Sequence, residues 1–541
     1  MARYNEYAGS PSFIEQDIAN IQAVTMEEVT RVYETYIKDK PYVATSFVPK
    51  GSLDLAASDS EKADVVEESI ADALEVSQDI SEEEEEIALT PSSFDRSEEP
   101  AMGPDPVVTP PEIWSDELSG GIEILGISYT EVPLVNYSLV INGGHLLDPS
   151  ERPGAAYLLA SMLTEGTATK TPEELEEAID MLGARISVYG GEQSISINVN
   201  TLVRNFESTV ALVEEILLEP RWDEEQFELA KSRVINNHKR NVANPNYLAN
   251  ITFNKLAFGE GSLLATPSSG TIESIEAISM EDLKSYYESN LSPSLASLHM
   301  VGNIPASKVK ATFDGINTRW ESKEVQLPEI EVPGNPEAPT IYFVDVPGAK
   351  QSVIQIGNLA PMRTHPDYDA IQTMNYKLGG SFSGFLNLIL REEKGFTYGA
   401  RSSFDGHNLY GTFQASSSVR SNATLESMEI FAGEMNKYRD GITEEDLAFT
   451  KDALIKSNAL QFENMRSLLW MLETISEYDL PFDYISREQE VVRSMTLESH
   501  RELAQKYILP QNMYYVVVGD AATQLEPLKS MGLGDPVLVE K

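Results

Sequence analysis

The chain has 541 residues, no cysteine, and a net charge of −46, with 86 Asp and Glu residues against 40 Lys and Arg residues. This acidity argues against binding to nucleic acid, whose phosphates require a basic face, and against binding to anionic membrane surfaces. The absence of cysteine excludes disulfides, thiolate metal sites and cysteine nucleophiles. No apolar run approaches the roughly 20 residues that span a bilayer, so we expect no membrane span.

Residues 1–51 end in a pattern that the chain uses three times. The segment VTMEEVTRVYETYIKDKPYVATSFVPKG begins at Val24, and segments with the same cadence begin at Ile278 and Met495. Each opens with Ser or Thr followed by acids, and continues with an amphipathic helix, a polar turn and an apolar strand. Because no domain fits ahead of the first unit, we expect residues 1–51 to be the C-terminal tail of a preceding copy, and the natural protein to be longer.

Residues 52–112 have the composition of a linker. Between positions 54 and 99 the chain has 17 acidic residues against only Lys62 and Arg96, and SEEEEE at 81–86 is a block of like charge. The following stretch is rich in proline and acids. Such compositions resist core formation, so we expect an acidic, Pro-rich linker that stays disordered.

Two homologous domains are expected to follow, at 113–323 and 341–523. Helix–turn–helix segments begin at Asn205 and Asn422, and each lies 73 residues ahead of its helix–strand unit. Equal spacing in two places indicates an internal repeat. Hairpin-like strand patterns in both copies favour an α+β fold, in which each domain is a mostly antiparallel sheet with helices packed on one face. Residues 324–340 are interpreted as a second linker and 524–541 as a tail.

The stretch LGGSFSGFLNLILREEKGFTYGARSSF, residues 378–404, resembles the C-terminal domain of the pitrilysin/insulinase family of zinc metallopeptidases. The resemblance covers nearly the whole chain except the acidic linker, and its R-E-E-K-G-x-x-Y segment is fairly specific. It implies an insulinase-like fold, in which one α/β unit is repeated four times as two halves that face each other across a closed chamber.

The zinc motif of that family, H-x-x-E-H with a glutamate far downstream, is degenerate in this chain. The matching helix, 154–167, places Tyr157, Ala160 and Ser161 at the three motif positions, and the downstream glutamate falls near Asn236 or Asn237. Two zinc-binding imidazoles must lie four residues apart on one helix face, and no two of the six histidines are within five residues of each other. We therefore expect no metal site and no cofactor-binding residues in this chain.

Arg391 and Tyr398 are the candidate catalytic residues. Taken alone, LNLILREEKG reads as a helix that Gly395 stops, with charges in its last turn and Tyr398 at the start of a strand. The resemblance implies more: in the family this arginine and tyrosine reach across the chamber from the half that lacks zinc and donate hydrogen bonds to the peptide being cut. Donors in a water-poor chamber stabilise the oxyanion that forms on the scissile carbonyl.

Two hypotheses about function remain open. The chain is either the zinc-lacking half of an insulinase-type metalloendopeptidase, inactive alone, or a non-catalytic scaffold or assembly subunit of the same fold. The first hypothesis requires a zinc-bearing insulinase-like half, on a longer chain or a separate subunit, and peptide substrates. The absence of cysteine is compatible with cytoplasm and periplasm alike, and we lean to the periplasm.

Overall fold

The structure is a computed structural model that describes residues 1–49, 51–62, 95 and 109–540. It divides into two units, Met1–Ala101 and Met102–Lys541, and each is described by itself. Most of the predicted disordered linker, 52–112, lies outside the described residues. Among the residues that are described, no helix is both long and apolar enough to cross a membrane.

The first unit consists of short helices. They are α1 (Ala2–Ala8), α2 (Phe13–Ala23), α3 (Met26–Tyr36) and a 3₁₀ turn, η1 (Leu53–Leu55). Thr25 caps α3 in a capping box with Glu28, as the sequence predicts. The strand expected after this helix does not form. Residues 37–49 are neither helix nor strand, and Phe47 is 99% exposed. A strand needs a neighbour for its backbone groups, and the described part of this unit contains no other strand.

The second unit begins with a domain built on a six-stranded sheet in the order β1-β2-β6-β3-β5-β4. Its strands are β1 (Ile113–Glu117), β2 (Glu123–Ser128), β3 (Leu134–Asn142), β4 (Arg185–Gly190), β5 (Ser194–Leu202) and β6 (Ala296–Gly302). Its helices are α5 (Ala155–Met162), α6 (Pro172–Met181), α7 (Phe206–Leu218), α8 (Glu224–Asn241), α9 (Pro245–Phe258), α10 (Ile272–Ala277), α11 (Met280–Asn290), α12 (Ala306–Thr312) and α13 (Asp314–Arg319).

The second domain of this unit is also built on a six-stranded sheet, in the order β12-β7-β11-β8-β10-β9. Its strands are β7 (Thr340–Asp345), β8 (Gln351–Ala360), β9 (Thr397–Gly406), β10 (Gly411–Arg420), β11 (Tyr514–Gly519) and β12 (Val537–Val539). Its helices are α14 (Tyr368–Asn375), α15 (Phe385–Asn387), α16 (Thr424–Tyr438), α17 (Glu444–Ser457), α18 (Met465–Tyr478), α19 (Tyr484–Ser494), α20 (Leu497–Tyr507) and α21 (Ala521–Leu528), with π-helical turns η6 (Tyr376–Gly380) and η7 (Leu388–Glu393).

Five strands have the same order in the two sheets, β2-β6-β3-β5-β4 and β7-β11-β8-β10-β9, which confirms the predicted α+β fold of two homologous domains. The sixth strand differs, because β1 precedes its domain's other strands and is antiparallel to β2, whereas β12 follows them and is parallel to β7. Most neighbouring strands are antiparallel, but β2–β6, β7–β11 and β7–β12 are parallel, so both sheets are mixed. In each sheet the helix–strand unit of the repeat inserts its strand, β6 or β11, into the middle of the sheet. Residues 524–540, expected to be a tail, are an exception to the prediction: they complete α21 and supply β12, which pairs with β7.

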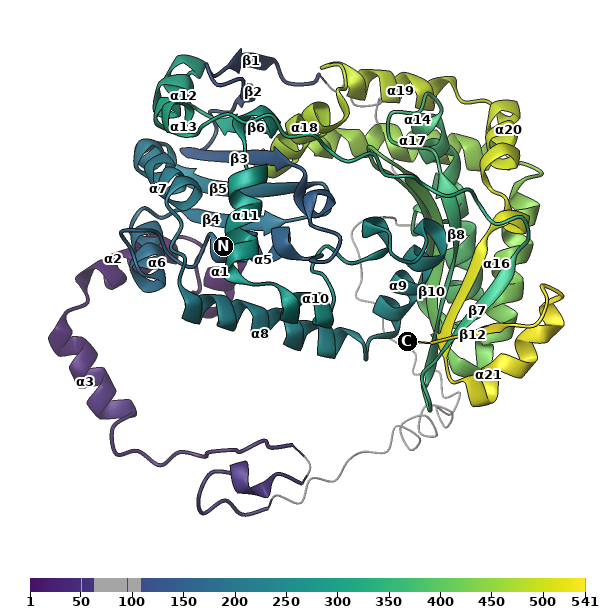
Figure 1. Cartoon of the computed structure of the whole chain (residues 1–541), viewed down its shortest axis with the longest axis horizontal. Helices are drawn as coiled ribbons and strands as arrows, with labels where there is room; N and C mark the ends of the chain where they lie inside the picture. Colours follow the sequence, from purple (N-terminus) through teal and green to yellow (C-terminus); the bar gives the residue numbers. More distant parts are fainter. Residues whose placement is uncertain (50, 63–94, 96–108, 541) are drawn as a thin grey trace. The chain divides into compact units, whose positions relative to one another are not determined.

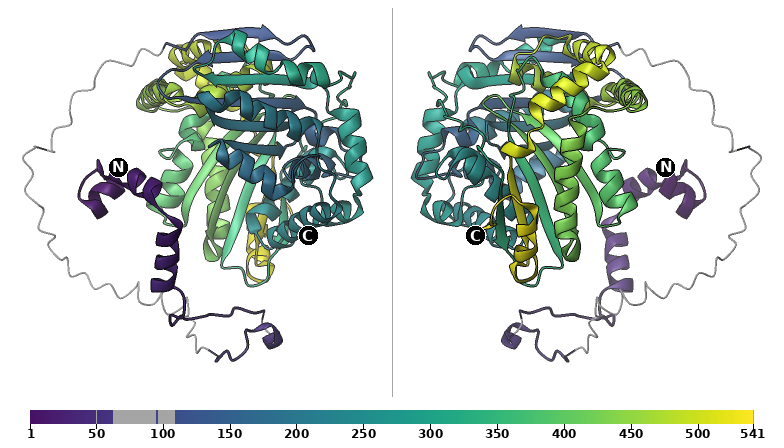
Figure 2. Two further views of the ribbon diagram at one scale, coloured as in Figure 1. Left: turned by 90° about the vertical axis from the view of Figure 1, so that its left-hand side faces the viewer. Right: turned by 90° about the vertical axis from the view of Figure 1, so that its right-hand side faces the viewer.

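Each sheet is covered on both faces, which the sequence did not indicate. One face of each packs against helices of its own domain. The other face packs against a helix from the other domain: α9 lies on β8 and β11, and α18 lies on β2, β3 and β6 (Figure 1). Figure 2 shows the two sheets of this unit from opposite sides. This double cover explains the continuous buried runs at 124–127 and 515–519.

Candidate functional site

The candidate site lies where β9 begins, at the edge of the second sheet. The segment before it starts as α15 and continues without a break into η7, whose wider π-helical turn carries Arg391. Gly395 then adopts a φ of +60°, the left-handed conformation that ends helices, and the chain turns into β9. π-helical turns of this kind are frequent at functional sites.

Tyr398 sits in a β-bulge. Along most of the β9–β10 ladder each residue has one partner, but Ala400 pairs with Ser417 whereas Thr397 pairs with Val419. Tyr398 and Gly399 therefore lie opposite the single residue Ser418. Without the extra residue Tyr398 would face Val419, which is fully buried in the core. The bulge turns its side chain outward instead, and the side chain is 91% exposed.

Hydroxyl groups hold the bulge in place. The Thr397 hydroxyl accepts a hydrogen bond from the Gly399 N–H at 3.1 Å and lies 2.7 Å from the carbonyl oxygen of Ser418. The Ser417 hydroxyl lies 2.9 Å from both the Thr397 hydroxyl and the Gly399 carbonyl oxygen. Polar groups that the interrupted ladder leaves unpaired are thus satisfied locally, which supports one conformation of Tyr398.

Asn387 joins the helix to the strand. Its side chain is 1% exposed. Its amide oxygen accepts a hydrogen bond from the Ala400 N–H at 3.1 Å, and its amide nitrogen donates to the Phe382 carbonyl at 2.8 Å. One buried amide therefore ties the loop before the helix, the helix that carries Arg391 and the strand that carries Tyr398.

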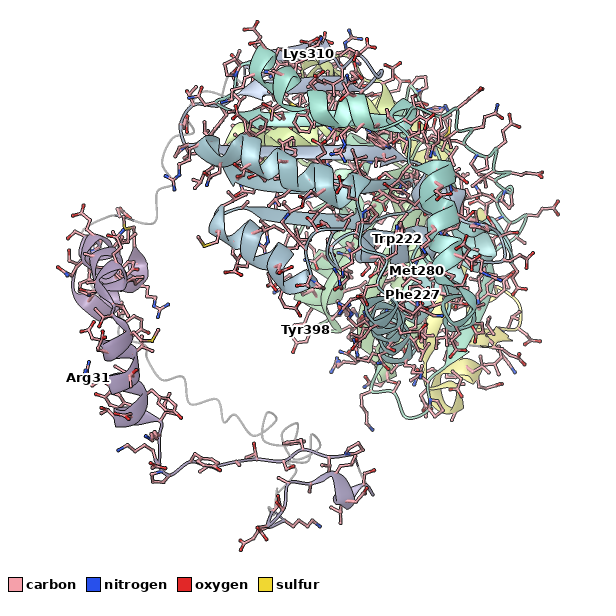
Figure 3. All side chains as sticks on the ribbon, turned by 60° about the vertical axis from the view of Figure 1, so that its left-hand side comes forward. Arg31, Trp222, Phe227, Met280, Lys310 and Tyr398 are labelled. Atoms are coloured by element: carbon pink, nitrogen blue, oxygen red, sulfur yellow. The ribbon has the colours of Figure 1, made fainter. Side chains whose placement is uncertain are left out.

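Arg391 is partly exposed and loosely held. Its side chain is 35% exposed and pairs with Glu392 at 2.7 Å. The guanidinium lies 4.5 Å from the ring centre of Phe382, which is itself 66% exposed. Because η7 packs against β9, Arg391 and Tyr398 stand on adjoining elements. Figure 3 shows Tyr398 projecting from the edge of the sheet. Both side chains therefore present N–H or O–H groups at the surface of the described structure.

The positions that correspond to the zinc motif lie on α5 in the first domain. Ala160 is buried in the core, while Tyr157 and Ser161 are partly exposed. Asn236 and Asn237 are exposed on α8, which packs against α5. These side chains do not fit zinc, because none is an imidazole or a carboxylate and hydroxyls must first lose a proton. Across the described residues no group of three or more His, Asp or Glu side chains could hold a metal ion.

A histidine next to α5 has a structural role. His145 is fully buried, with Nδ1 2.6 Å from an Asp148 carboxylate oxygen and Nε2 3.1 Å from the Leu263 carbonyl oxygen. Asp148 also accepts hydrogen bonds from the Gly154 and Ala156 N–H groups at the start of the helix. The pair therefore fixes the helix end, as expected of a core histidine.

A partly buried ionic cluster joins α14 and α19 next to β9. Arg363 pairs with Asp369 at 2.9 Å and with Glu488 at 2.6 Å, and its guanidinium lies 4.7 Å from the Tyr368 ring centre. Burial, and then repulsion from Asp369, raise the pKa of Glu488 to about 7, although Arg363 acts in the opposite direction. One arginine does not fully offset two carboxylates that are both partly withdrawn from water.

Sequence reasoning missed Phe382, Asn387 and the residues that hold the bulge. Asn387 left a signal, because it is one polar residue inside the apolar run FLNLIL, where a buried amide is expected to have specific partners. The bulge left no signal, because it lies in the first three residues of β9, too short a stretch to show that the alternation is interrupted.

Two family models match the chain. The model described as Insulinase (Peptidase family M16) matches residues 125–263, and the model described as the Peptidase M16 inactive domain matches residues 277–454. Curated relatives are distant. An uncharacterized zinc protease of Mycobacterium leprae is 22% identical over 356 residues, which cover 65% of this chain and 79% of the relative. A protein of Helicobacter pylori called a non-peptidase homolog, YmxG, is 21% identical over 397 residues, which cover 72% and 90%.

Solved structures share the fold. A crystal structure of a peptidase M16 inactive domain from Pseudomonas fluorescens matches with a TM-score of 0.71 at 23% identity, and covers 76% of this chain and 99% of that one. The crystal structure of a protease from Helicobacter pylori matches with a TM-score of 0.69 at 15% identity, and covers 75% and 99%. At these identities the likeness establishes the fold alone.

Proposed function

Because this chain carries domains of the insulinase (M16) peptidase family, we propose that it is the zinc-lacking half of a metalloendopeptidase. In this proposal it closes a chamber against a zinc-bearing half and binds the scissile peptide carbonyl through Arg391 and Tyr398. The match to the family's inactive-domain model supports this assignment, as does the lack of zinc-binding side chains at the motif positions.

The observation that carries the proposal is the exposure of Tyr398. A tyrosine at the start of an edge strand would ordinarily bury its ring against the helices, as the register of β9 requires. Here a bulge, four hydroxyl contacts and a buried amide hold it 91% exposed. Local irregularities that cost stability are commonly found at functional sites.

The chemistry suits the two side chains. A phenol donates one hydrogen bond, and a guanidinium donates several and stays charged at any working pH. When water attacks a peptide carbonyl, negative charge develops on its oxygen, and donors that approach that oxygen lower the barrier. Arg391 and Tyr398 would act on the carbonyl oxygen only. The attacking water and its proton acceptor would belong to the other half.

The first unit offers a second contact with such a partner. Counting from the N-cap residues Thr25 and Ser279, Met26 and Val29 correspond without a gap to Met280 and Leu283 of α11. Met280 and Leu283 are buried, whereas their counterparts Met26 and Val29 are exposed. We propose that residues 1–51 belong to a domain of the zinc-bearing half, in which this apolar face is covered.

A reconstitution assay tests the proposal. The full chain is mixed with an insulinase-family polypeptide that carries H-x-x-E-H, and cleavage of a fluorogenic peptide is measured. We expect Arg391→Ala and Tyr398→Phe each to lower kcat about 10²–10³-fold, the usual effect of removing one oxyanion donor. Arg185→Ala and Tyr189→Phe on the exposed edge strand β4 are matched controls and should leave the rate unchanged.

The alternative is a scaffold of the same fold, which the name of the Helicobacter pylori relative, a non-peptidase homolog, favours. The same assay separates the two readings. Unchanged cleavage in both Arg391→Ala and Tyr398→Phe, with the chain still bound to its partner, would favour the scaffold and exclude the catalytic role.

A further inference from the structure

A cavity of about 510 Å³ lies between the two domains of the second unit, and neither Arg391 nor Tyr398 lines it. One wall is the face of the first sheet that its own helices leave uncovered, formed by β3, β5 and β6. The opposite wall is α18, and the rest includes the β9–β10 turn and part of the stretch between the domains. A volume of this size is in the usual range for small-molecule sites, about 300–1,000 Å³.

The sheet wall is polar because the residues of β5 alternate between apolar and polar side chains. In β5, Ile195 and Ile197 are buried in the core, and the residues that alternate with them are Ser194, Ser196 and Asn198. These three point to the other face and line the cavity. A wall of hydroxyls and amides beside α18 is suited to a polar ligand.

The α18 wall supplies two carboxylates. Glu473 and Glu477 are one helical turn apart and both line the cavity. Burial raises the pKa of the Glu473 carboxyl, whereas Glu477 is an exposed residue of this wall. No lysine or arginine of the described residues lines this cavity. Its fixed charge is therefore negative.

His299 adds a third acceptor. The Ser138 hydroxyl lies 3.4 Å from His299 Nδ1. Burial lowers the pKa of His299 to about 4, so the ring is neutral near pH 7. A neutral imidazole has one bare nitrogen, and Nε2 is that acceptor when Nδ1 donates to the Ser138 hydroxyl. His299 lines the cavity, is 1% exposed, and its Nε2 has no hydrogen-bond partner within the described structure. The Ser476 hydroxyl, also on the wall, is buried without a partner as well.

We propose that this cavity binds an aliphatic organic cation, an ammonium or guanidinium group on a short carbon chain. Such groups have several N–H donors and no acceptor, which matches two carboxylates and a bare imidazole nitrogen. Val140, Leu146 and Leu409 line other parts of the cavity and would contact the carbon chain. An anion would meet two carboxylates without a compensating cation, so the cavity selects against it.

The site goes beyond the proposed peptidase role and does not depend on it. The cation could be a free small molecule or the basic side chain of a peptide. The recognition chemistry is the same in the two cases, so the experiment includes a probe for each.

Isothermal titration calorimetry on the full chain tests the proposal with agmatine, which carries a guanidinium and an ammonium group, and with the tripeptide Gly-Arg-Gly. Glutarate, a dianion of similar length, is the control. We expect one site per chain with a Kd below about 1 mM for at least one cation, and no binding of glutarate. Binding of agmatine alone identifies a free cation as the ligand, and binding of the tripeptide identifies a peptide side chain.

Two variants locate the site. Glu477 is exposed, so Glu477→Gln should fold normally and weaken binding about tenfold or more. Ser196→Leu should fill the cavity and abolish binding, with thermal unfolding recorded to show that the chain is folded. Glu490→Gln, an exposed carboxylate on α19 that does not line the cavity, is the matched control. Absence of binding by both cations, or equal binding in Glu477→Gln and the natural chain, would overturn the proposal.

Discussion

The two domains use the same sheet but finish its edge differently. In the first domain α6 leads through Gly183 into β4, and in the second η7 leads through Gly395 into β9. The two glycines have φ values of +58° and +60°, so they are equivalent points of the fold. Counting from them, Ile179 and Ile186 occupy the positions of Arg391 and Tyr398. Both isoleucines pack on the first core.

Two further differences accompany this one. The β4–β5 ladder is regular, whereas the β9–β10 ladder has the bulge at Tyr398. The position of Asn387 is taken by Leu175, which is buried in the first core. The comparison teaches that an edge of this sheet either closes over an apolar core or exposes polar donors. The second edge differs from the first by the bulge at Tyr398 and by the buried amide of Asn387, while the order of the neighbouring strands is the same.

Replacing the donors with the residues of the first domain is expected to have the largest effect. Arg391→Ile with Tyr398→Ile should lower kcat/KM of the reconstituted peptidase at least about 10³-fold, because both proposed oxyanion donors are removed. The unfolding temperature should hardly change, since Tyr398 is exposed and Arg391 partly so. Peptide cleavage and thermal unfolding of the same samples are the measurements. If the doubly substituted chain keeps its activity, the difference between the two edges has no catalytic role.

The charge cluster behind the second edge should make stability depend on pH. The pKa of Glu488 is raised to about 7, so between roughly pH 4.5 and 7 the unfolded chain loses a proton that the folded chain keeps. This contribution to stability is full at low pH and is lost as the pH rises through 7. At about 1.4 kcal/mol per pKa unit it amounts to about 3 kcal/mol.

Glu488→Gln should therefore flatten the change in unfolding free energy between pH 4.5 and 7, measured by urea denaturation. Glu490→Gln lies on the same helix but is exposed, and it should keep the slope of the natural chain. A slope that is the same in Glu488→Gln would show that Arg363 fully compensates the buried carboxylate.

Exchange of the buried amide for the leucine of the first domain should have a smaller effect. Asn387→Leu leaves the Ala400 N–H and the Phe382 carbonyl without their partner, at a cost of about 2 kcal/mol in unfolding free energy. Cleavage should fall as well, because η7 and β9 are no longer tied. Leu175→Asn in the first domain should lower stability without lowering cleavage, and a loss of activity in that variant would argue that the two edges are not separate.

The smallest expected effect comes from the bulge itself. Thr397→Val removes the hydroxyl that contacts the Gly399 N–H and the Ser418 carbonyl, and it should cost about 1 kcal/mol, the usual net value of one hydrogen bond. Hydrogen exchange at Gly399 and Ala400 should become faster than in the natural chain. If exchange there stays as slow as before, the ladder and not the hydroxyl holds Tyr398 outward.

The sequence predicted what local chemistry determines. Helices α3, α11 and α20 all begin at the expected N-cap residues, Thr25, Ser279 and Thr496, each with a capping box. The strands that follow were predicted from the same pattern, but only β6 and β11 form. Helices satisfy their backbone bonds internally, while strands need neighbours that the pattern does not guarantee.

The candidate site was named from a resemblance, and its geometry was not predictable. Nothing in FTYGARSSF indicates that Tyr398 and Gly399 share one partner across the ladder. The edge strand β12 was missed because Val537–Val539 is too short a run to show a period of two. The polar wall of the cavity was visible as alternation in SISINVNTL, but its opposite wall comes from α18, nearly 300 positions away.

The exchange of covering helices has a mechanical consequence. Since α9 rests on the second sheet and α18 on the first, pulling the two domains apart would strip both sheets at once and expose two apolar clusters to water. A hinge between the two domains is therefore disfavoured. If the chain closes a chamber as we propose, the opening that admits a polypeptide has to form between residues 109–540 and the partner half.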